Sequence, residues 1–196
     1  MNRCFLGFEL SEKCRVDLES WLRPIFKRMQ EELNWQVKKV LPMNWHATLL
    51  FFPKLKPEAR EIAWNQVVSW TEKKVWNVED FQWRGLEIWP SAANPKLICL
   101  GGDIFKSSQL WPLASSLKAF PFQAGHGEPV LSYRPHITLS RFPRGRKRIE
   151  EIAWRQFISL HTPLPKNLIQ LDRISFFISK RTVQNPVYMR ERTICL

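Results

Sequence analysis

HATLLFFP at residues 46–53 and HITLSRFP at residues 136–143 are two copies of one pattern, and they begin ninety residues apart. The copies share His, Thr, Leu, Phe and Pro at equivalent positions. The match continues downstream, where EIAW at residues 61–64 recurs as EIAW at residues 151–154. A repeat of this kind indicates two related halves, each of which contributes one copy of a functional strand.

Each copy is predicted to be a β-strand, along which successive side chains point to opposite faces. His46 and Thr48 therefore share one face, about 6.6 Å apart along the chain. His136 and Thr138 do the same in the second half. If the two halves place these strands side by side, two imidazoles and two hydroxyls converge on one small volume.

The same alternation predicts where the neighbouring side chains point. Ser140 falls on the face of His136, whereas Arg141 falls on the opposite face and reaches a phosphate only if a bulge or the strand's end turns it round. Phe52 shares the face of His46 and is a candidate for stacking on a base, with core packing the favoured alternative. The residues expected to face the core in the first strand are Trp45, Ala47, Leu49 and Phe51.

Two histidines and two threonines in this arrangement suit the cleavage of a phosphoester. One neutral imidazole removes a proton from water while the other, protonated, delivers one to the departing oxygen, and each transfer is typically worth ~10²–10⁴-fold in rate. Histidine titrates where both forms are available at neutral pH. The threonine hydroxyls donate hydrogen bonds to the non-bridging phosphate oxygens. This chemistry requires no metal, cofactor or nucleophilic side chain, and it makes His46 and His136 the candidate catalytic residues.

Charge favours a polyanionic partner. The 196 residues include 30 Lys and Arg against 18 Asp and Glu, which gives a net charge of +12 and a pI near 9.9. Such an excess indicates nucleic acid first and an anionic membrane second, while a generally basic protein is the alternative. A basic run directly follows the second copy and is a candidate RNA-binding segment, or else a solvated loop. Its charged residues are Arg144, Arg146, Lys147 and Arg148.

Composition also bounds the class of protein. With 44% hydrophobic residues, the chain is long enough to fold as one globular domain over residues 1–196. No apolar run approaches the ~20 residues of a membrane-spanning helix, and the N-terminal stretch lacks the features of a secretion signal. Four cysteines far apart in the sequence, without a C-x-x-C motif, favour reduced thiols and a cytoplasmic protein over a zinc site or a disulfide framework.

Hydrophobic periodicity predicts strands that alternate with helices. The expected helices begin at Ser11, with Pro24 as a possible kink, at Pro57 and at about Ser108. The expected strands cover residues 3–9, 35–41, 45–52, 81–89, 96–100, 133–142, 171–179 and 187–195, with turns at 42–44 and 90–95. No linker divides the chain, so the pattern predicts a two-lobed, mixed α/β domain.

The sequence resembles the 2H phosphoesterases, which are named for paired His-x-Thr/Ser motifs. It looks most like their bacterial RNA 2′,3′-cyclic phosphodiesterase branch, also called 2′-5′ RNA ligase-like proteins. The resemblance covers nearly the whole chain, from RCFLGF at residues 3–8 through NWHATL at 44–49 to PVY at 186–188. It is sharpest at RPHITLSR, residues 134–141. Ala47, in place of a larger apolar residue, and Pro53, in place of a common glycine, are departures that alter the edge of the cleft.

This resemblance implies an α+β fold of two lobes related by a pseudo-twofold axis, with mainly antiparallel sheet, outer helices and a central cleft. It also implies metal-free opening of an RNA 2′,3′-cyclic phosphate to a 2′-phosphate without a cofactor, with 2′-5′ RNA ligation as the reverse reaction. Carried over by motif position, His46 is the acid that protonates the 3′ oxygen and His136 is the base that activates water. Thr48, Thr138 and Arg141 bind the phosphate. The implied protein is a monomer whose partner is RNA with a 2′,3′-cyclic phosphate or a 2′-5′ linkage, not a membrane.

Three other hypotheses stay open on sequence alone. The same site suits hydrolysis of 2′-5′ linkages or of another cyclic phosphate. The chain also suits a non-catalytic RNA-binding module, since it is basic and rich in aromatic residues. A metal enzyme is disfavoured because no third histidine or carboxylate clusters beside the motifs. His126 and His161 lack the motif spacing and are expected to be solvent-exposed loop residues.

Overall fold

The computed structural model describes residues 2–72, 81–104, 135–145, 149–161, 164–165, 168–180 and 187–195. Several predictions fall outside these ranges. These predictions concern the helix expected from about Ser108, the residue His126 and the side chain of His161. They also concern Arg146, Lys147 and Arg148 of the basic run.

The eight strands in the described ranges form one sheet, in which every pairing is antiparallel. In chain order they are β1 (Asn2–Leu10), β2 (Lys38–Lys39), β3 (His46–Leu55), β4 (Phe81–Ser91), β5 (Asn94–Ile104), β6 (His136–Arg141), β7 (Leu171–Lys180) and β8 (Val187–Cys195). Their order across the sheet is β4-β5-β6-β3-β1-β7-β8, and β2 pairs with β6 beside this path.

The repeat in the sequence is a symmetry of the sheet. β3 and β6 meet where Ala47 pairs with Ile137, which is its equivalent residue in the repeat. Equivalent residues that face each other across an antiparallel pair lie on a local twofold axis. Outward from this axis, β1 and β7 follow β3 on one side, and β5 and β4 follow β6 on the other. The first lobe therefore consists of β3, β1, β7 and β8, and the second of β6, β5, β4 and β2.

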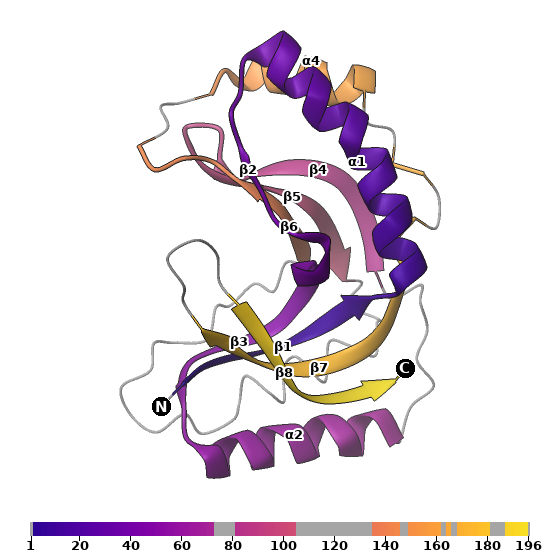
Figure 1. The fold of residues 1–196 in the computed structure, drawn as a ribbon, viewed down its shortest axis with the longest axis vertical. Coiled ribbons are helices and arrows are strands. Elements are labelled where there is room, and N and C mark those ends of the chain that lie inside the picture. The colour runs from indigo at the N-terminus through magenta and orange to yellow at the C-terminus, as the bar shows by residue number, and fades with distance from the viewer. Residues whose placement is uncertain are drawn as a thin grey trace.

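This arrangement confirms the two-lobed α+β fold that the resemblance implied. The mixed α/β class predicted from periodicity is wrong, because all the strand pairs are antiparallel. Helices cover the outside of the sheet (Figure 1): α1 (Glu12–Leu33), α2 (Pro57–Glu72) and α4 (Glu151–His161). α2 lies against the first lobe, and α4 lies beside one end of α1 at the opposite end of the molecule (Figure 1). α2 and α4 contain the two EIAW copies, so they are equivalent as well.

The longest helix, α1, has capping residues at both of its ends. Ser11 caps α1, since its Oγ accepts a hydrogen bond from the amide of Cys14 at 3.1 Å. Asn34 ends the helix in the left-handed conformation, at a φ of 49°, and the helix continues through Pro24. Its buried face joins the main hydrophobic core and consists of Cys14, Leu18, Leu22, Ile25, Phe26 and Met29.

Two predicted elements differ from the structure. The strand expected over residues 35–41 shrinks to β2, and Trp35 instead packs in the core against Trp154, with ring centroids 5.6 Å apart. The turn expected over residues 90–95 is mostly sheet, because β4 and β5 continue as a hairpin to the pair Ser91–Asn94. A two-residue connection suffices to join antiparallel strands.

In the parts of the chain that the structure describes, no helix has the length and apolar character needed to cross a membrane. The four cysteines form no disulfide bonds: Cys4, Cys14 and Cys99 are buried, and Cys195 is exposed.

Candidate active site

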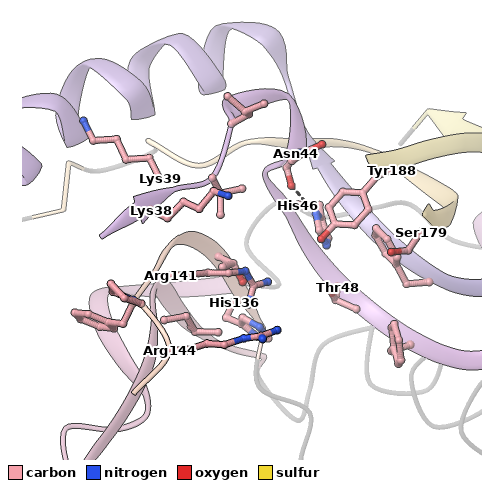
Figure 2. A pocket seen from close by; sticks show the side chains of 18 residues that line it. Lys38, Lys39, Asn44, His46, Thr48, His136, Arg141, Arg144, Ser179 and Tyr188 are labelled. Carbon is pink, nitrogen blue, oxygen red and sulfur yellow. Dashed lines mark hydrogen bonds between the residues drawn. The ribbon is translucent and has the colours of Figure 1, made fainter. Parts of the chain in front are cut away.

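A pocket of about 730 Å³ has walls from both lobes and receives both His-x-Thr pairs. His46 and Thr48 reach it from β3, and His136 and Thr138 reach it from β6 (Figure 2). All four side chains are half-buried, so they combine a fixed position with access to solvent. The convergence expected from the sequence is present in the structure.

The register of the two motif strands explains this convergence. Ala47 and Ile137 form the pair on the twofold axis and are fully buried on the core side of the sheet. The residues that flank this pair point the other way, into the pocket. In antiparallel order, His46 stands across from Thr138 and Thr48 stands across from His136.

Both motif strands contain a register shift one residue beyond the threonine. In the pairing of β1 with β3, the register skips Leu49. In the pairing of β5 with β6, it skips Leu139, which is the equivalent residue. An extra residue of this kind is a β-bulge, and it reverses the faces to which all later side chains of the strand point.

The bulges overturn the predicted faces of four side chains. Arg141 points into the pocket, whereas Ser140 is fully buried. On the equivalent strand, Phe51 is 50% exposed and lines the pocket, although it was expected to face the core. Phe52 is fully buried and stacks on Phe176, so it is not available to stack on a base. Strict alternation gave the wrong faces because it does not count the extra residue.

His46 is held by groups from three elements. Its Nδ1 lies 2.7 Å from the backbone oxygen of Asn44, at the end of the short 3₁₀ helix η1 (Pro42–Asn44). Phe5 stacks on the ring at a centroid distance of 4.5 Å, and Tyr188 meets it edge-on at 5.2 Å. Gly7 leaves room for the ring, since a Cβ there would lie only 3.3 Å from the His46 Cδ2.

These contacts define the protonation state of His46. A carbonyl oxygen only accepts hydrogen bonds, so Nδ1 carries the proton of the neutral ring and Nε2 is left as an acceptor. Burial lowers the pKa of His46 from 6.5 to about 4, with smaller lowering effects from the charges of His136 and Arg141. The bond to Asn44 and the charge of Glu9 oppose this shift. The ring is therefore neutral at pH 7 in the free protein.

We expect this lowered pKa to appear in the pH dependence of stability. The unfolded chain takes up a proton at His46 as the pH falls below 6.5, whereas the folded ring resists it until about pH 4. The stabilisation is thus complete above pH 6.5 and is lost as the pH falls toward 4, by at most about 3 kcal/mol. Urea unfolding of the wild type and of His46→Gln at pH 7 and pH 4.5 measures it. The variant should lose less free energy of unfolding, and equal losses in both proteins would refute the assignment.

His136 has a different neighbour. The indole of Trp89 lies against its ring at a centroid distance of 4.3 Å. The indole is anchored, because its Nε1 donates a hydrogen bond of 2.8 Å to Glu87, which also accepts one of 2.8 Å from Arg84. The anchored indole therefore holds the His136 ring in place at the pocket.

Arg141 connects the two lobes across the pocket. Its positive charge acts on the hydroxyl of Tyr188, which comes from β8 of the first lobe. Burial raises the pKa of Tyr188, and the nearby Arg141 guanidinium only partly opposes that effect, so the hydroxyl stays protonated at neutral pH. Arg141 lines the pocket together with His136 and Thr138, where an anion fits.

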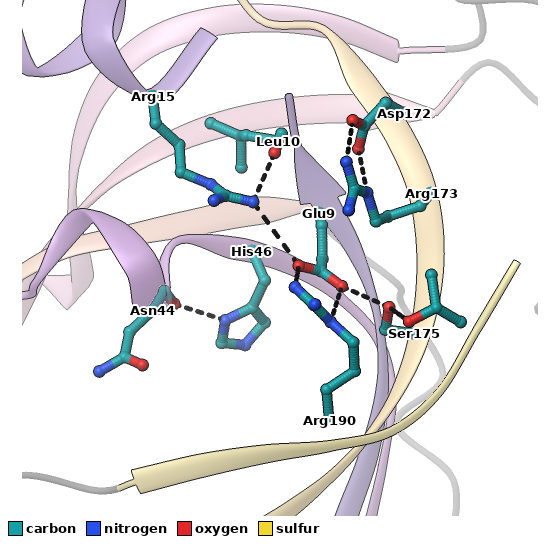
Figure 3. A network of polar contacts seen from close by, with 10 residues as sticks. Glu9, Leu10, Arg15, Asn44, His46, Asp172, Arg173, Ser175 and Arg190 are labelled. Atoms are coloured by element: carbon teal, nitrogen blue, oxygen red, sulfur yellow. Dashed lines mark hydrogen bonds and ion pairs between the residues drawn. The ribbon is translucent and has the colours of Figure 1, made fainter. Parts of the chain in front are cut away.

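A buried carboxylate lies beside His46 on the neighbouring strand (Figure 3). Glu9 pairs with His46 in the register of β1 and β3 and is only 3% exposed. Arg190 donates two hydrogen bonds to it, and Ser175 donates a third. Arg15 is within 3.6 Å. This network joins β1, β7 and β8 beside His46.

Sequence reasoning placed the histidines, threonines and Arg141 but missed other residues of the pocket wall. Lys38, Lys39, Asn44 and Tyr188 all line it. The NWHATL and PVY matches covered Asn44 and Tyr188 without assigning them a role, and no signal pointed to Lys38 or Lys39. Arg144 lines the pocket as well. In the described part of the chain, no group of three or more His, Cys, Asp or Glu side chains is arranged to hold a metal ion.

No known protein-family profile matches the sequence, and no curated protein matches it. Solved structures do match over nearly the whole chain. E. coli LigT in its apo form has a TM-score of 0.63 and 16% identity, over 99% of this chain and 96% of LigT. TT0787 of Thermus thermophilus has a TM-score of 0.60 and 18% identity, over 99% and 97% of the two chains. Usb1 of Kluyveromyces marxianus has a TM-score of 0.58 and 12% identity, over 96% and 98%.

These similarities establish the fold. The chain has the 2H phosphoesterase fold of its LigT neighbours, as its resemblance to that superfamily implied. Two further E. coli LigT structures are complexes, one with phosphate and one with 3′-AMP.

Proposed function

We propose that a protein with this fold and this pocket is a phosphodiesterase that opens RNA 2′,3′-cyclic phosphate ends to 2′-phosphates without a metal ion. The observation that carries the proposal is the convergence of two His-x-Thr pairs on one pocket, across the Ala47–Ile137 pair. Two imidazoles on opposite sides of one phosphorus are the minimum that general acid–base cleavage requires. The complexes of E. coli LigT with phosphate and 3′-AMP support a nucleotide phosphate as the ligand of this fold.

In this mechanism, His136 removes a proton from the attacking water and becomes an imidazolium. Trp89 stabilises this imidazolium, because its indole lies against the His136 ring. His46 donates a proton to the 3′ oxygen as the bond from phosphorus to that oxygen breaks. Thr48, Thr138 and Arg141 donate hydrogen bonds to the non-bridging oxygens, whose negative charge they stabilise through the reaction.

The lowered pKa of His46 bears directly on its role as the acid. With a pKa of about 4, the free protein holds little of the protonated ring at neutral pH. A bound phosphate brings a negative charge next to the ring, and an adjacent opposite charge favours the protonated form. Substrate binding thus raises the pKa of His46 and loads the proton that the departing oxygen receives.

The test is hydrolysis of a 2′,3′-cyclic-ended oligoribonucleotide in the presence of EDTA. We expect turnover to persist in the chelator and the product to have a 2′-phosphate, as assigned by ³¹P NMR. A parallel reaction with a 2′-5′-linked oligonucleotide measures the competing activity. Loss of turnover on chelation, or full activity of the double variant His46→Ala/His136→Ala, would reject the proposal.

A further inference from the structure

The strands beside the two motif strands are equivalent, but they place different residues next to the two histidines. β1 pairs with β3 on one side of the twofold axis, and β5 pairs with β6 on the other. Glu9 stands opposite His46 in the first pair, and Gly101 stands opposite His136 in the second. Position 101 is therefore the equivalent of Glu9, so the second lobe has a glycine where the first has a buried carboxylate (Figure 3).

A carboxylate from the next strand occupies the space that this glycine leaves open. A Cβ on residue 101 would overlap with the carboxylate of Glu87, which comes from β4. Residues that stand opposite each other across an antiparallel pair point to the same face, with Cβ atoms about 4.5–5.5 Å apart. The Glu87 carboxylate therefore lies beside the side chain of His136. Both histidines thus have a neighbouring carboxylate, which β1 supplies in the first lobe and β4 supplies in the second.

The Glu87 carboxylate also holds the indole that packs against His136. Its Oε2 accepts the 2.8 Å hydrogen bond from Nε1 of Trp89, whose ring centroid lies 4.3 Å from that of His136. Its Oε1 accepts the 2.8 Å bond from Arg84, which also pairs with Asp103 at 2.9 Å. The side chains of Glu87, Arg84 and Asp103 together have one net negative charge. Glu87 is thus held in place, with its charge, beside the ring.

Charged and titratable groups surround His136 on every described strand next to it. They are His46 on β3, Arg84 and Glu87 on β4, Asp103 on β5 and Arg141 on β6, with Lys38, Lys39, Arg144 and Tyr188 in the same pocket lining. Most of them are cations, which oppose a positive charge on the ring. The two carboxylates favour it, and Glu87 is the nearer, because Asp103 lies two residues or about 6.6 Å beyond Gly101 along β5.

We propose that Glu87 is a positioning residue for His136, whose carboxylate stabilises the imidazolium that forms when His136 accepts the proton of the attacking water. This inference rests on the proposed function. The proton passes from the water to the ring, the water oxygen bonds to phosphorus, and the bond from phosphorus to the 3′ oxygen breaks. Glu87 neither gains nor loses a proton. An opposite charge close to the ring favours the charged form, so the carboxylate makes His136 a stronger base.

Titration of His136 in the free protein measures this interaction directly. Glu87→Gln removes the charge but keeps an oxygen that can accept the bond from Trp89. The variant should lower the pH at which His136 titrates by about half to one unit. NMR of ¹³C-labelled imidazoles measures this pH, and the spectrum of His136→Gln assigns the signal.

Asp103→Asn is the matched control, because it removes one carboxylate charge from the same cluster around Arg84. The Asp103 side chain is 47% exposed, compared with 23% for Glu87. Solvent and salt screen its charge more strongly, and the charge is farther from the ring. The control should therefore change the titration of His136 by less than about 0.2 unit.

Hydrolysis of a cyclic-ended oligoribonucleotide tests the consequence for the reaction. At a pH well above both titrations, His136 is neutral in the wild type and in Glu87→Gln alike, so only the strength of the base differs. A weaker base removes the proton from water more slowly, so kcat/KM should fall about two- to fourfold in this variant. Asp103→Asn should keep the rate of the wild type.

Three results would overturn the role of Glu87. The first is an unchanged titration of His136 in Glu87→Gln, and the second is an equal change in Glu87→Gln and Asp103→Asn. The third is a changed titration with the full kcat/KM, since the charge would then not assist the reaction. The titration requires no turnover. Failure of the proposed function would appear separately, as a wild type that shows the expected titration but does not open the cyclic phosphate.

Discussion

Replacing His136 or His46 with alanine should lower kcat/KM for a 2′,3′-cyclic-ended oligoribonucleotide by about 10²–10⁴-fold each. Each imidazole makes one proton transfer, and neither has a substitute within the pocket, whose other described ionisable side chains are Lys, Arg and Tyr. Because the two transfers belong to one reaction, the double variant should lose far less than the product of the single losses. Initial rates on the cyclic-ended RNA, with affinity for the 2′-phosphate product as a check of folding, measure these effects.

A modified substrate separates the roles of the two histidines. In a 2′,3′-cyclic phosphate with sulfur in place of the bridging 3′ oxygen, the leaving group departs as a thiolate and needs no proton. On this substrate, His46→Ala should lose less than about tenfold, whereas His136→Ala should keep its full defect of about 10²–10⁴-fold. The opposite pattern would show that His46 is the base. Equal defects in both variants on both substrates would mean that neither ring acts as a simple acid.

Replacing Arg190 with methionine should destabilise the protein by about 2–4 kcal/mol, somewhat below the loss for a fully buried pair. The substitution leaves Glu9 buried without the two hydrogen bonds that Arg190 donates. Ser175 still donates one, and Arg15 is 3.6 Å away, so the carboxylate keeps part of its compensation. The free energy of unfolding in urea measures the change.

Two companion variants identify the cause. Glu9→Gln/Arg190→Met removes the buried charge together with its partner, so it should be less destabilised than Arg190→Met alone. Arg192→Met is the matched control on the same strand, because Arg192 pairs with Glu61 at the surface and both side chains are exposed. Its effect should be small. If Arg190→Met behaved like Arg192→Met, the buried network would not contribute to stability.

Much of the fold follows from pattern alone. Ser11 and the apolar stripe after it located α1, and the repeat located the two strands on the axis. The sequence prediction lacked a helix at α4, although its EIAW copy matches that of α2, where a helix was expected. The strand predicted around β2 was too long, since Lys38 and Lys39 pair with Arg141 and Ser140 of β6, which are 103 and 101 residues later in the sequence.

The two β-bulges could not be predicted from the motif strands alone. Leu49 and Leu139 look like ordinary strand residues, and what makes each one extra is the register of the neighbouring strand. Alternation therefore assigned Phe51 and Arg141 to the wrong face, and it could not reveal that they occupy equivalent places in the pocket. Lys38, which lies on the separate strand β2, has no sequence signal that links it to the histidines.

The twofold relation between the motif strands bears on the polarity of the RNA. Half a turn about Ala47 and Ile137 exchanges the two histidines and the two threonines, so these four groups alone do not distinguish a strand from the same strand reversed. An RNA strand has a direction, and a site whose groups are exchanged by a twofold rotation binds both directions equally well. Phe51 and Arg141 are equivalent pocket positions at which the halves differ in charge, so they can make the distinction. In the proposed reaction, an uncharged ring on one side and a cation on the other give the substrate a single orientation.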